Sequence, residues 1–215
     1  MKTAETKTYG VCETVDNLGT CYWEPLNYVT PYTAGTGPSN EQFQTRFGQQ
    51  YHLVGFRLKM AFSNYPAEGV ASIKPLMVRV VIVEAYKEQA TIKPTSLTPM
   101  FIDGQSERVD WADIGLTMAS MCYKIDHKKY RTVKDQVFVL GNGSNSANGW
   151  AIKMLDWWVP IKKDINCDEM NTGDLQQDRC YYFGYWAYDP QLPNTELIPG
   201  PVRMSWAKKT YWKDP

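Results

Sequence analysis

The chain has 215 residues, and its 23 Lys and Arg residues balance its 23 Asp and Glu residues. This zero formal net charge excludes a whole-molecule attraction to nucleic acid and lets copies of the chain approach one another without strong repulsion. Aromatic residues make up 13% of the chain, which suits strands and interfaces. The length allows a substantial core, so we expect residues 1–215 to form one domain whose folding does not depend on disulfides.

Eight segments have the composition of β-strands and are separated by clusters of Gly, Pro, Asn and Ser. In chain order they are 8–15, 20–26, 51–63, 76–86, 130–140, 151–161, 180–188 and 202–212. Segment 76–86 is apolar on both faces except for Arg79 and Glu84, which predicts a central strand. One helix is expected near 111–123, and βαβ patterning is absent. The pattern predicts an all-β antiparallel sandwich with long loops and at most one short helix.

Segment 51–63 shows the clearest alternation of apolar and polar residues. We expect its apolar face to be buried, with the residues Val54, Phe56, Leu58, Met60 and Phe62. The opposite face carries Arg57 and Lys59, whose positions a sheet would hold. Val80 and Ile82 are also expected in the core. The segment therefore predicts one strand face for packing and one for contact with a partner.

No set of residues selects an enzymatic reaction. The chain has two His residues and lacks a GxSxG nucleophile motif. His52 is in phase with the apolar face of segment 51–63, so we interpret it as a residue at the edge of the core, and His127 as solvated. No pair of carboxylates stands out for glycoside hydrolysis. We therefore predict a protein that is not an enzyme and uses no cofactor.

Acidic and thiol residues do not predict a metal site. Asp164, Asn166 and Asp168 match the first three ligand positions of a calcium loop, but Glu169 and Leu175 replace the required Gly and bidentate Glu. We interpret this segment as a solvated acidic loop, with calcium held between subunits as the alternative. The five Cys residues include no CxxC pair, and the N-terminus has no apolar signal core, which favours reduced thiols in an intracellular setting.

The cations on strands are the main candidates for a binding function. Segment 124–163 is rich in Lys and Arg, whereas segment 168–196 is acidic, so one side could meet an anionic polymer and another side copies of the chain. Neutralising phosphates needs cations rather than a sequence-reading helix. The candidate nucleic-acid-binding residues are Arg57, Lys59, Lys128, Lys129, Arg131 and Lys134. The alternative is that they form ordinary solvated surface.

Two adjacent tryptophans add a second kind of contact. In a regular strand Trp157 and Trp158 point to opposite faces, so one should lie in the core. The other would pack on a neighbouring side chain or stack on a base.

Five passages between residues 46 and 189 share the order and approximate spacing of one known family. They are RFGQQY at 46–51 leading into LVGFRLKMAF, VRVVIV at 78–83, YRTVKDQVFVL at 130–140, WVPIKK at 158–163 and the aromatic run at 182–188. Together they resemble the coat (capsid) proteins of small circular single-stranded DNA viruses that encode a replication initiator protein, such as circoviruses and geminiviruses. The first passage resembles that family's Arg-x-Gly turn before a cation-bearing strand.

The resemblance implies a single jelly roll and a sixty-copy icosahedral, T=1 shell around single-stranded viral DNA. It implies as partners the chain itself, the DNA through its phosphates and a host receptor, with no membrane. The location is then the virion, and during assembly the host cell, with the nucleus as a candidate. The family usually begins with a long Arg-rich arm, whereas here only Lys2 and Lys7 precede Thr8. Similar jelly rolls occur in small RNA viruses, and a carbohydrate-binding β-sandwich is the alternative function.

Overall fold

A computed structural model describes residues 6–17, 22–29, 48–64, 75–85, 101–102, 108–109, 121–141, 151–167, 178–188 and 202–214. Its strands are β1 (Lys7–Asn17), β2 (Tyr22–Pro25), β3 (Gln50–Asn64), β4 (Leu76–Ala85), β5 (Phe101–Ile102), β6 (Arg108–Val109), β7 (Lys124–Ile125), β8 (Tyr130–Leu140), β9 (Ile152–Asn166), β10 (Cys180–Tyr188) and β11 (Val202–Lys213). Each of the eight predicted segments overlaps one of the eight longer strands, several of which extend beyond the predicted bounds. Within these residues no helix is long and apolar enough to cross a membrane.

The predicted helix at 111–123 lies largely outside the described residues, and its described part, 121–123, is not α-helical. The short strands β5, β6 and β7 were not predicted, since pairs of residues carry too little periodicity to identify. They form a small three-stranded sheet in the order β6-β5-β7.

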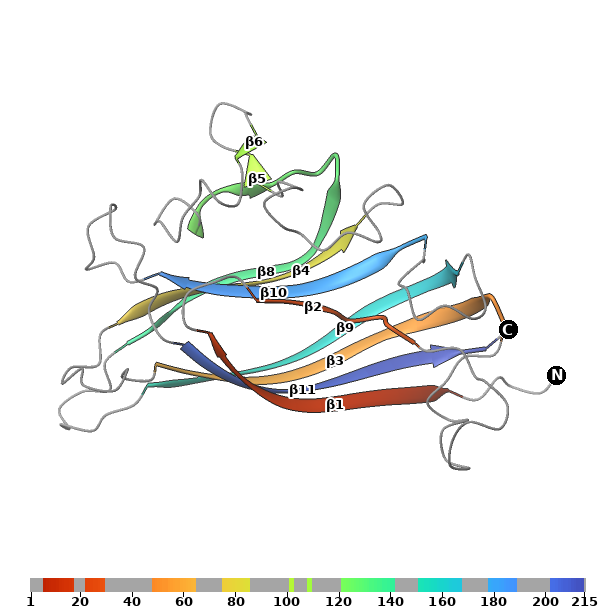
Figure 1. Cartoon of the computed structure of the whole chain (residues 1–215), viewed down its shortest axis with the longest axis horizontal. Helices are drawn as coiled ribbons and strands as arrows, with labels where there is room; N and C mark the ends of the chain where they lie inside the picture. The colour runs from red at the N-terminus through yellow and green to blue at the C-terminus, as the bar shows by residue number, and fades with distance from the viewer. Residues whose placement is uncertain are drawn as a thin grey trace.

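Two four-stranded antiparallel sheets form the two layers of the molecule (Figure 1). The first sheet has the order β1-β11-β3-β9, and the second has the order β2-β10-β4-β8. As predicted, β4 is a central strand, with β10 and β8 on its two sides. Figure 1 also shows β5 and β6 beyond the second sheet, on the side away from the first.

The long strands pair in a nested order. β1 pairs with β11, β2 with β10, β3 with β9 and β4 with β8, all antiparallel. The chain therefore follows the path of one long hairpin wrapped around the core, and the pairs β3·β11 and β4·β10 join its arms. Two sheets of four strands in this arrangement form a jelly roll, so the predicted fold is confirmed.

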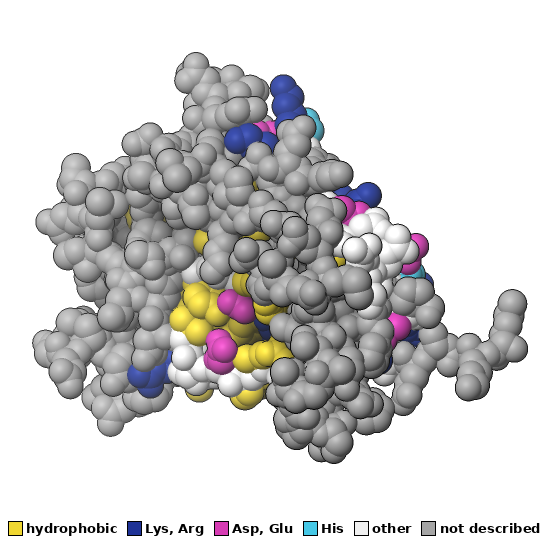
Figure 2. Space-filling view, turned by 45° about the vertical axis from the view of Figure 1, so that its right-hand side comes forward, with side chains coloured by type: hydrophobic (Ala, Val, Ile, Leu, Met, Phe, Trp, Pro, Cys, Tyr) yellow, Lys and Arg dark blue, Asp and Glu magenta, His cyan; other side chains and the backbone are white. Residues whose placement is uncertain are grey.

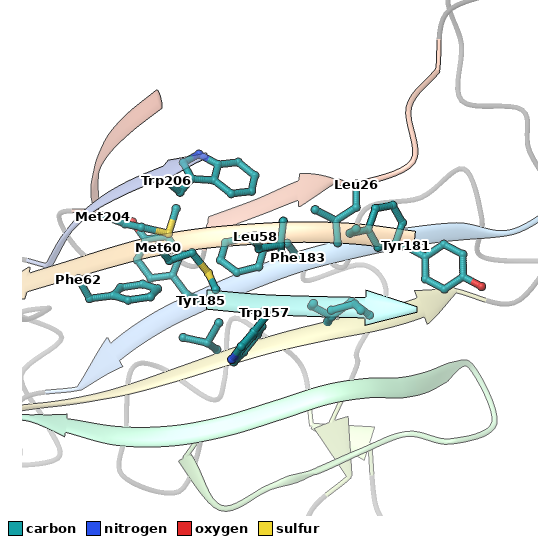
Figure 3. Close-up of a cluster of buried hydrophobic side chains, with 14 of the residues drawn as sticks. Leu26, Leu58, Met60, Phe62, Trp157, Tyr181, Phe183, Tyr185, Met204 and Trp206 are labelled. Atoms are coloured by element: carbon teal, nitrogen blue, oxygen red, sulfur yellow. The ribbon is translucent and has the colours of Figure 1, made fainter. Parts of the chain in front are cut away.

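The facing sides of the two sheets enclose the main core. The five side chains predicted from β3 and β4, Phe56, Leu58, Met60, Val80 and Ile82, are all at most 1% exposed. Figure 3 shows Leu58 and Met60 lying among side chains of the opposite sheet, including Phe183 and Tyr185. The rings of Phe183 and Trp206 stack across the interior with centroids 5.1 Å apart. Burial of these large side chains is the main stabilising term of the sandwich.

β3 departs from strict alternation at Val54. The register of β3 shifts between Leu53 and Gly55 against β9, and it shifts again at the corresponding place against β11. Leu53 is therefore fully buried with Phe56, whereas Val54 is only partly buried. The predicted burial of Val54 was wrong, because an irregularity of one residue moves all preceding side chains to the opposite face.

The same irregularity corrects the interpretation of His52. Its side chain is 42% exposed, and its Nδ1 lies 2.7 Å from Oδ1 of Asp164 on β9. His52 therefore does not lie at the edge of the core. It pairs with an exposed carboxylate instead.

The outer face of the second sheet is covered. A second cluster of buried residues lies there, with members from the sheet and from the stretch before β8: Trp23, Val81, Val83, Ala85, Met121, Ile125, Tyr130, Cys180, Tyr182, Trp186 and Tyr188. Gly184 makes room for Trp23, because a Cβ at Gly184 would lie 2.3 Å from that ring. Arg79 is 5% exposed and donates hydrogen bonds to Asp135 at 2.9 and 2.5 Å. We call this side of the molecule the covered face.

Candidate nucleic-acid interface

The outer face of the first sheet, called here the open face, has no second buried cluster among the described residues. The register of the four strands aligns its outward side chains in rows. One row contains Gly10, Lys209, Arg57 and Trp158, and the next contains Cys12, Ala207, Lys59 and Asp156. Cations from β3 and β11 therefore stand next to one another on a rigid surface.

A depression of about 340 Å³ lies on the open face. Its floor includes the small residues Gly10, Cys12 and Ala207, which leave space between the longer side chains around them. Three outward-pointing cations also line it, namely Arg57, Lys59 and Lys209, together with Lys208, whose side chain is 4% exposed. A shallow hollow bordered by cations is suited to a phosphate and the sugar attached to it.

Asp156 on β9 partly neutralises these cations. Its carboxylate accepts hydrogen bonds from Arg57 Nη2 at 3.0 Å and Nε at 3.3 Å, and Lys59 Nζ lies 4.0 Å away. The hydrogen bond from Arg57 holds the pKa of Asp156 below its usual range, and the same bond raises the pKa of Arg57. Both groups stay ionised at neutral pH, so one carboxylate faces two cations. Lys209 adds a third cation to this surface, in register with Arg57.

Aromatic side chains border the cations. Trp157 is 7% exposed and Trp158 is 51% exposed, which confirms the prediction that they point to opposite faces. The ring of Trp158 meets that of Tyr211 edge to face, with centroids 5.4 Å apart. A Cβ at Gly55 would lie 2.4 Å from Val159 O and 3.3 Å from the Trp158 ring, so glycine permits this close packing. Half of the Trp158 surface remains open to a stacking partner.

The structure does not bring the other four predicted cations to Arg57 and Lys59. Lys128 and Lys129 lie in the turn before β8, where Asp126 accepts hydrogen bonds from both of their backbone N–H groups. Lys134 lies at the edge of the sandwich, with its Nζ 5.3 Å from the centroid of the Trp157 ring. These residues therefore lie on β8 of the second sheet or in the turn before it, away from the open face.

Arg131 belongs to an ion cluster around Glu84, a carboxylate that is 1% exposed. Glu84 accepts hydrogen bonds from Lys163 at 2.8 and 3.0 Å and from Arg179 at 2.7 Å, and Arg131 lies 3.5 Å away. Burial opposes ionisation of Glu84, but the bonds from Lys163 and Arg179 outweigh it and lower its pKa. Because these three cations bind one buried carboxylate, they join β4, β8, β9 and the start of β10.

Sequence reasoning did not select Lys209 or Tyr211. The signal was present in the alternation of β11, where Trp206 is buried and every second residue from Ala207 points outward. Lys208, the neighbour of Lys209, points inward and is 4% exposed, with Nζ 3.1 Å from Glu24. Of these two adjacent lysines, Lys208 therefore points into the sandwich and Lys209 points out of it. Only the alternation of side chains along the strand distinguishes them.

The acidic segment does not form a metal site within the described residues, where no group of three or more His, Cys, Asp or Glu could hold an ion. Asp164 pairs with His52, and Asn166 donates a hydrogen bond to Asp178 at 2.9 Å. Asp168, the third residue of the calcium pattern, lies outside the described residues. Cys12, Cys122 and Cys180 are free thiols.

Comparisons with known proteins give similarity to solved structures alone, since no family model and no curated protein matches the chain. A structure titled Desmodium yellow mottle tymovirus has 10% identity and a TM-score of 0.32 over 98% of this chain and 89% of that one. An aminopeptidase from a marine sediment Thaumarchaeota archaeon has 8% identity and a TM-score of 0.28, over 95% and 34%. A mud crab tombus-like virus structure has 14% identity and a TM-score of 0.24, over 100% and 84%. At these scores the similarities support no statement about function, which is argued from the chain itself.

Proposed function

We propose that this chain is a structural capsid protein that assembles with its own copies into a small icosahedral shell and binds single-stranded viral DNA on its open face. The observation that carries the proposal is the contrast between the two outer faces of the jelly roll. One is covered by a second core, and the other presents Arg57, Lys59 and Lys209 around a depression beside Trp158. A shell wall needs one surface for its contents and other surfaces for its neighbours.

Binding on the open face would be to phosphates, with Trp158 available to stack on a base of any sequence. The formal net charge of zero and the pairing of Arg57 with Asp156 make the contact of one subunit weak. Many copies in a shell present the same patch together, so the assembled particle would bind far more tightly than the subunit. This explains how a neutral chain could retain a nucleic acid.

The aromatic content that suggested a carbohydrate-binding module has another explanation in the structure. Five tryptophans are buried in the two cores, namely Trp23, Trp157, Trp186, Trp206 and Trp212. Trp158 is the exposed tryptophan among the described residues, and it stands beside cations. Sugar rings have no charge for these cations to neutralise, so the open face favours a phosphate polymer.

The proposal is tested by neutralising the open face without disturbing the fold. Purified shells of the double variant Arg57→Gln/Lys59→Gln should stay intact but contain less nucleic acid. The ratio of nucleic-acid absorbance to protein absorbance measures the content, and sedimentation checks that the shells are intact. Removing two phosphate contacts should also flatten the salt dependence of single-strand binding by about 1.4 in log–log slope, at roughly 0.7 per contact. The matched control is Lys128→Gln/Lys129→Gln, which removes two cations from the covered side.

Two results would contradict the proposal. If both double variants retained as much nucleic acid as the parent, the open face would be ordinary solvated surface. If the parent chain stayed a monodisperse monomer at high concentration across pH and salt, the capsid function itself would be excluded.

A further inference from the structure

The sandwich has two open flanks on opposite sides. β1 and β2 are the edge strands at one side of the two sheets, and β8 and β9 are the edge strands at the other. Among the described residues, each of these four strands pairs with a single neighbour in its sheet. Edge strands expose backbone groups and side chains to any partner that approaches them.

The flank formed by β1 and β2 is acidic. Glu13 on β1 is exposed and Glu24 on β2 is partly exposed. Both carboxylates act on Tyr22, whose pKa is raised mainly by burial and further by Glu24 and Glu13. Tyr22 itself packs on Tyr185, with centroids 5.5 Å apart. Lys208 pairs with Glu24, so Glu13 contributes the charge that this pair does not neutralise. We call these residues the acidic flank.

Figure 2 shows an area of the surface where acidic groups (magenta) lie next to hydrophobic side chains (yellow). A partner with a cation beside apolar side chains could pair with such an acidic group and cover the apolar side chains in one contact.

The flank formed by β8 and β9 is basic and apolar. Lys134 on β8 and Lys153 on β9 are exposed, and Lys153 makes no ion pair with any described residue. Four large apolar side chains lie exposed on the same two strands: Val137 at 41%, Val139 at 58%, Ile152 at 63% and Met154 at 77%. We call these residues the basic flank. By register, Ile152 and Met154 point to the open face beside Ser63 and Ala61, and Val137 and Val139 point to the outer side of the second sheet beside Arg79 and Met77. Exposed apolar side chains therefore border the basic flank on both sides, as expected of a surface that another protein covers.

Charged side chains at sheet edges have a second known use, which is to prevent uncontrolled pairing of strands. That use needs charge of either sign and does not require that the two flanks differ. Here the charges that remain after pairing within the molecule differ in sign: Glu13 lies on one flank, and Lys134 and Lys153 lie on the other. Other charges of these edge strands are paired internally, such as Lys7 with Asp214 on one flank and Asp135 with Arg79 and Asp156 with Arg57 on the other. Because of this difference in sign, the charges of the two flanks are complementary to each other. Preventing the pairing of edge strands does not by itself explain such complementarity.

We propose that the acidic flank of one copy binds the basic flank of the next copy. The inference rests on the proposed function, and it names the surfaces that hold neighbouring subunits together. Because the two flanks are different surfaces, the contact is heterologous, and repeating it around an axis closes a ring. Opposite charges fix the orientation of the two copies, and the apolar side chains of the basic flank supply the buried area.

The test reverses one charge on each flank. Glu13→Lys and Lys153→Glu alone should each place like charges across the contact and raise the concentration needed for assembly about tenfold or more. The double variant Glu13→Lys/Lys153→Glu should restore assembly, because the charges are again opposite. Lys128→Glu is the control for a reversed surface lysine outside both flanks. Light scattering and sedimentation velocity measure the assembled fraction, and circular dichroism checks the fold of each variant.

A second measurement locates the contact directly. Equal amounts of ¹⁴N- and ¹⁵N-labelled parent protein are assembled together and treated with a carbodiimide, which joins carboxylates to amines in direct contact. Mass spectrometry should find mixed-isotope peptides joining Glu13 or Glu24 to Lys134 or Lys153.

The outcomes separate the two proposals. If the parent assembles but both single reversals assemble equally well and no mixed-isotope link joins the flanks, this inference is wrong and the capsid function stands. If the single reversals fail and the double variant fails as well despite a native circular dichroism spectrum, the charges do not face each other and the inference is again wrong. If the parent does not assemble at all, the proposed function fails first.

Discussion

The outer faces of the two sheets carry the same kinds of side chain but differ in what lies over them. On the covered face, Trp186 is fully buried and Arg79 with Asp135 forms a shielded ion pair. On the open face, Trp158 and the pair of Arg57 with Asp156 are each about half exposed. Whether other residues cover a sheet face therefore decides whether its aromatic ring and ion pair stabilise the fold or remain available to a ligand.

The comparison is tested most strongly with the two tryptophans. Trp186→Ala should cost about 3–5 kcal/mol of unfolding free energy, because it empties a fully buried site next to the Arg79 guanidinium. Trp158→Ala should cost at most about 1 kcal/mol, since it removes one edge-to-face contact at the surface. Urea denaturation of the isolated subunit measures both. Equal losses would show that the two faces do not differ in the way described.

The two ion pairs give a smaller effect of the same kind. Asp135→Asn leaves the Arg79 charge without its carboxylate at a site where Arg79 is 5% exposed. The expected loss is about 2–3 kcal/mol, somewhat below that of a fully buried pair because Asp135 keeps some contact with water. Asp156→Asn should leave the denaturation midpoint unchanged, because water screens that pair. A midpoint that moved as far in Asp156→Asn as in Asp135→Asn would mean that the open face is shielded too.

Acid should remove a stabilising contribution of the Glu84 ion cluster that is fully present at neutral pH. The folded-state pKa of Glu84 lies below its usual value of 4.5, so its ion cluster contributes stability above that pH. This contribution should be lost as the pH falls through the folded-state pKa, because protonation removes the charge that Lys163 and Arg179 bind. Denaturation midpoints measured from about pH 6 to about pH 3 should fall less steeply in Glu84→Gln than in the parent. Identical slopes would show that this carboxylate does not control acid stability.

The sequence predicted the jelly-roll strands well because each long strand carries its own alternation or apolar run. The error at Val54 has a specific cause: the register of β3 depends on β9 and β11, which are distant in sequence. An irregularity between partners is invisible in the strand itself.

The candidate site was predicted only in part, for a related reason. Alternation identifies Arg57 and Lys59 as outward-pointing, and the structure places them so. It cannot show that Lys209 joins them, since that depends on β11 lying beside β3. Nor can it show that Arg131 is held by Glu84, a residue on a neighbouring strand. The sequence of a strand predicts which of its side chains point outward. The pairing of strands decides which outward side chains become neighbours.

The nested pairing of the strands has a consequence for the order of events during synthesis. β11 lies between β1 and β3, so β1 has no partner in its sheet until the last long strand has emerged from the ribosome. Contacts between the two ends of a chain of this length form late, because closing so large a loop costs entropy before any contact compensates it. The depression on the open face and the acidic flank both depend on β1 or β11. A nascent chain therefore cannot bind a polymer or a neighbour through these surfaces before β11 has left the ribosome and paired with β1 and β3.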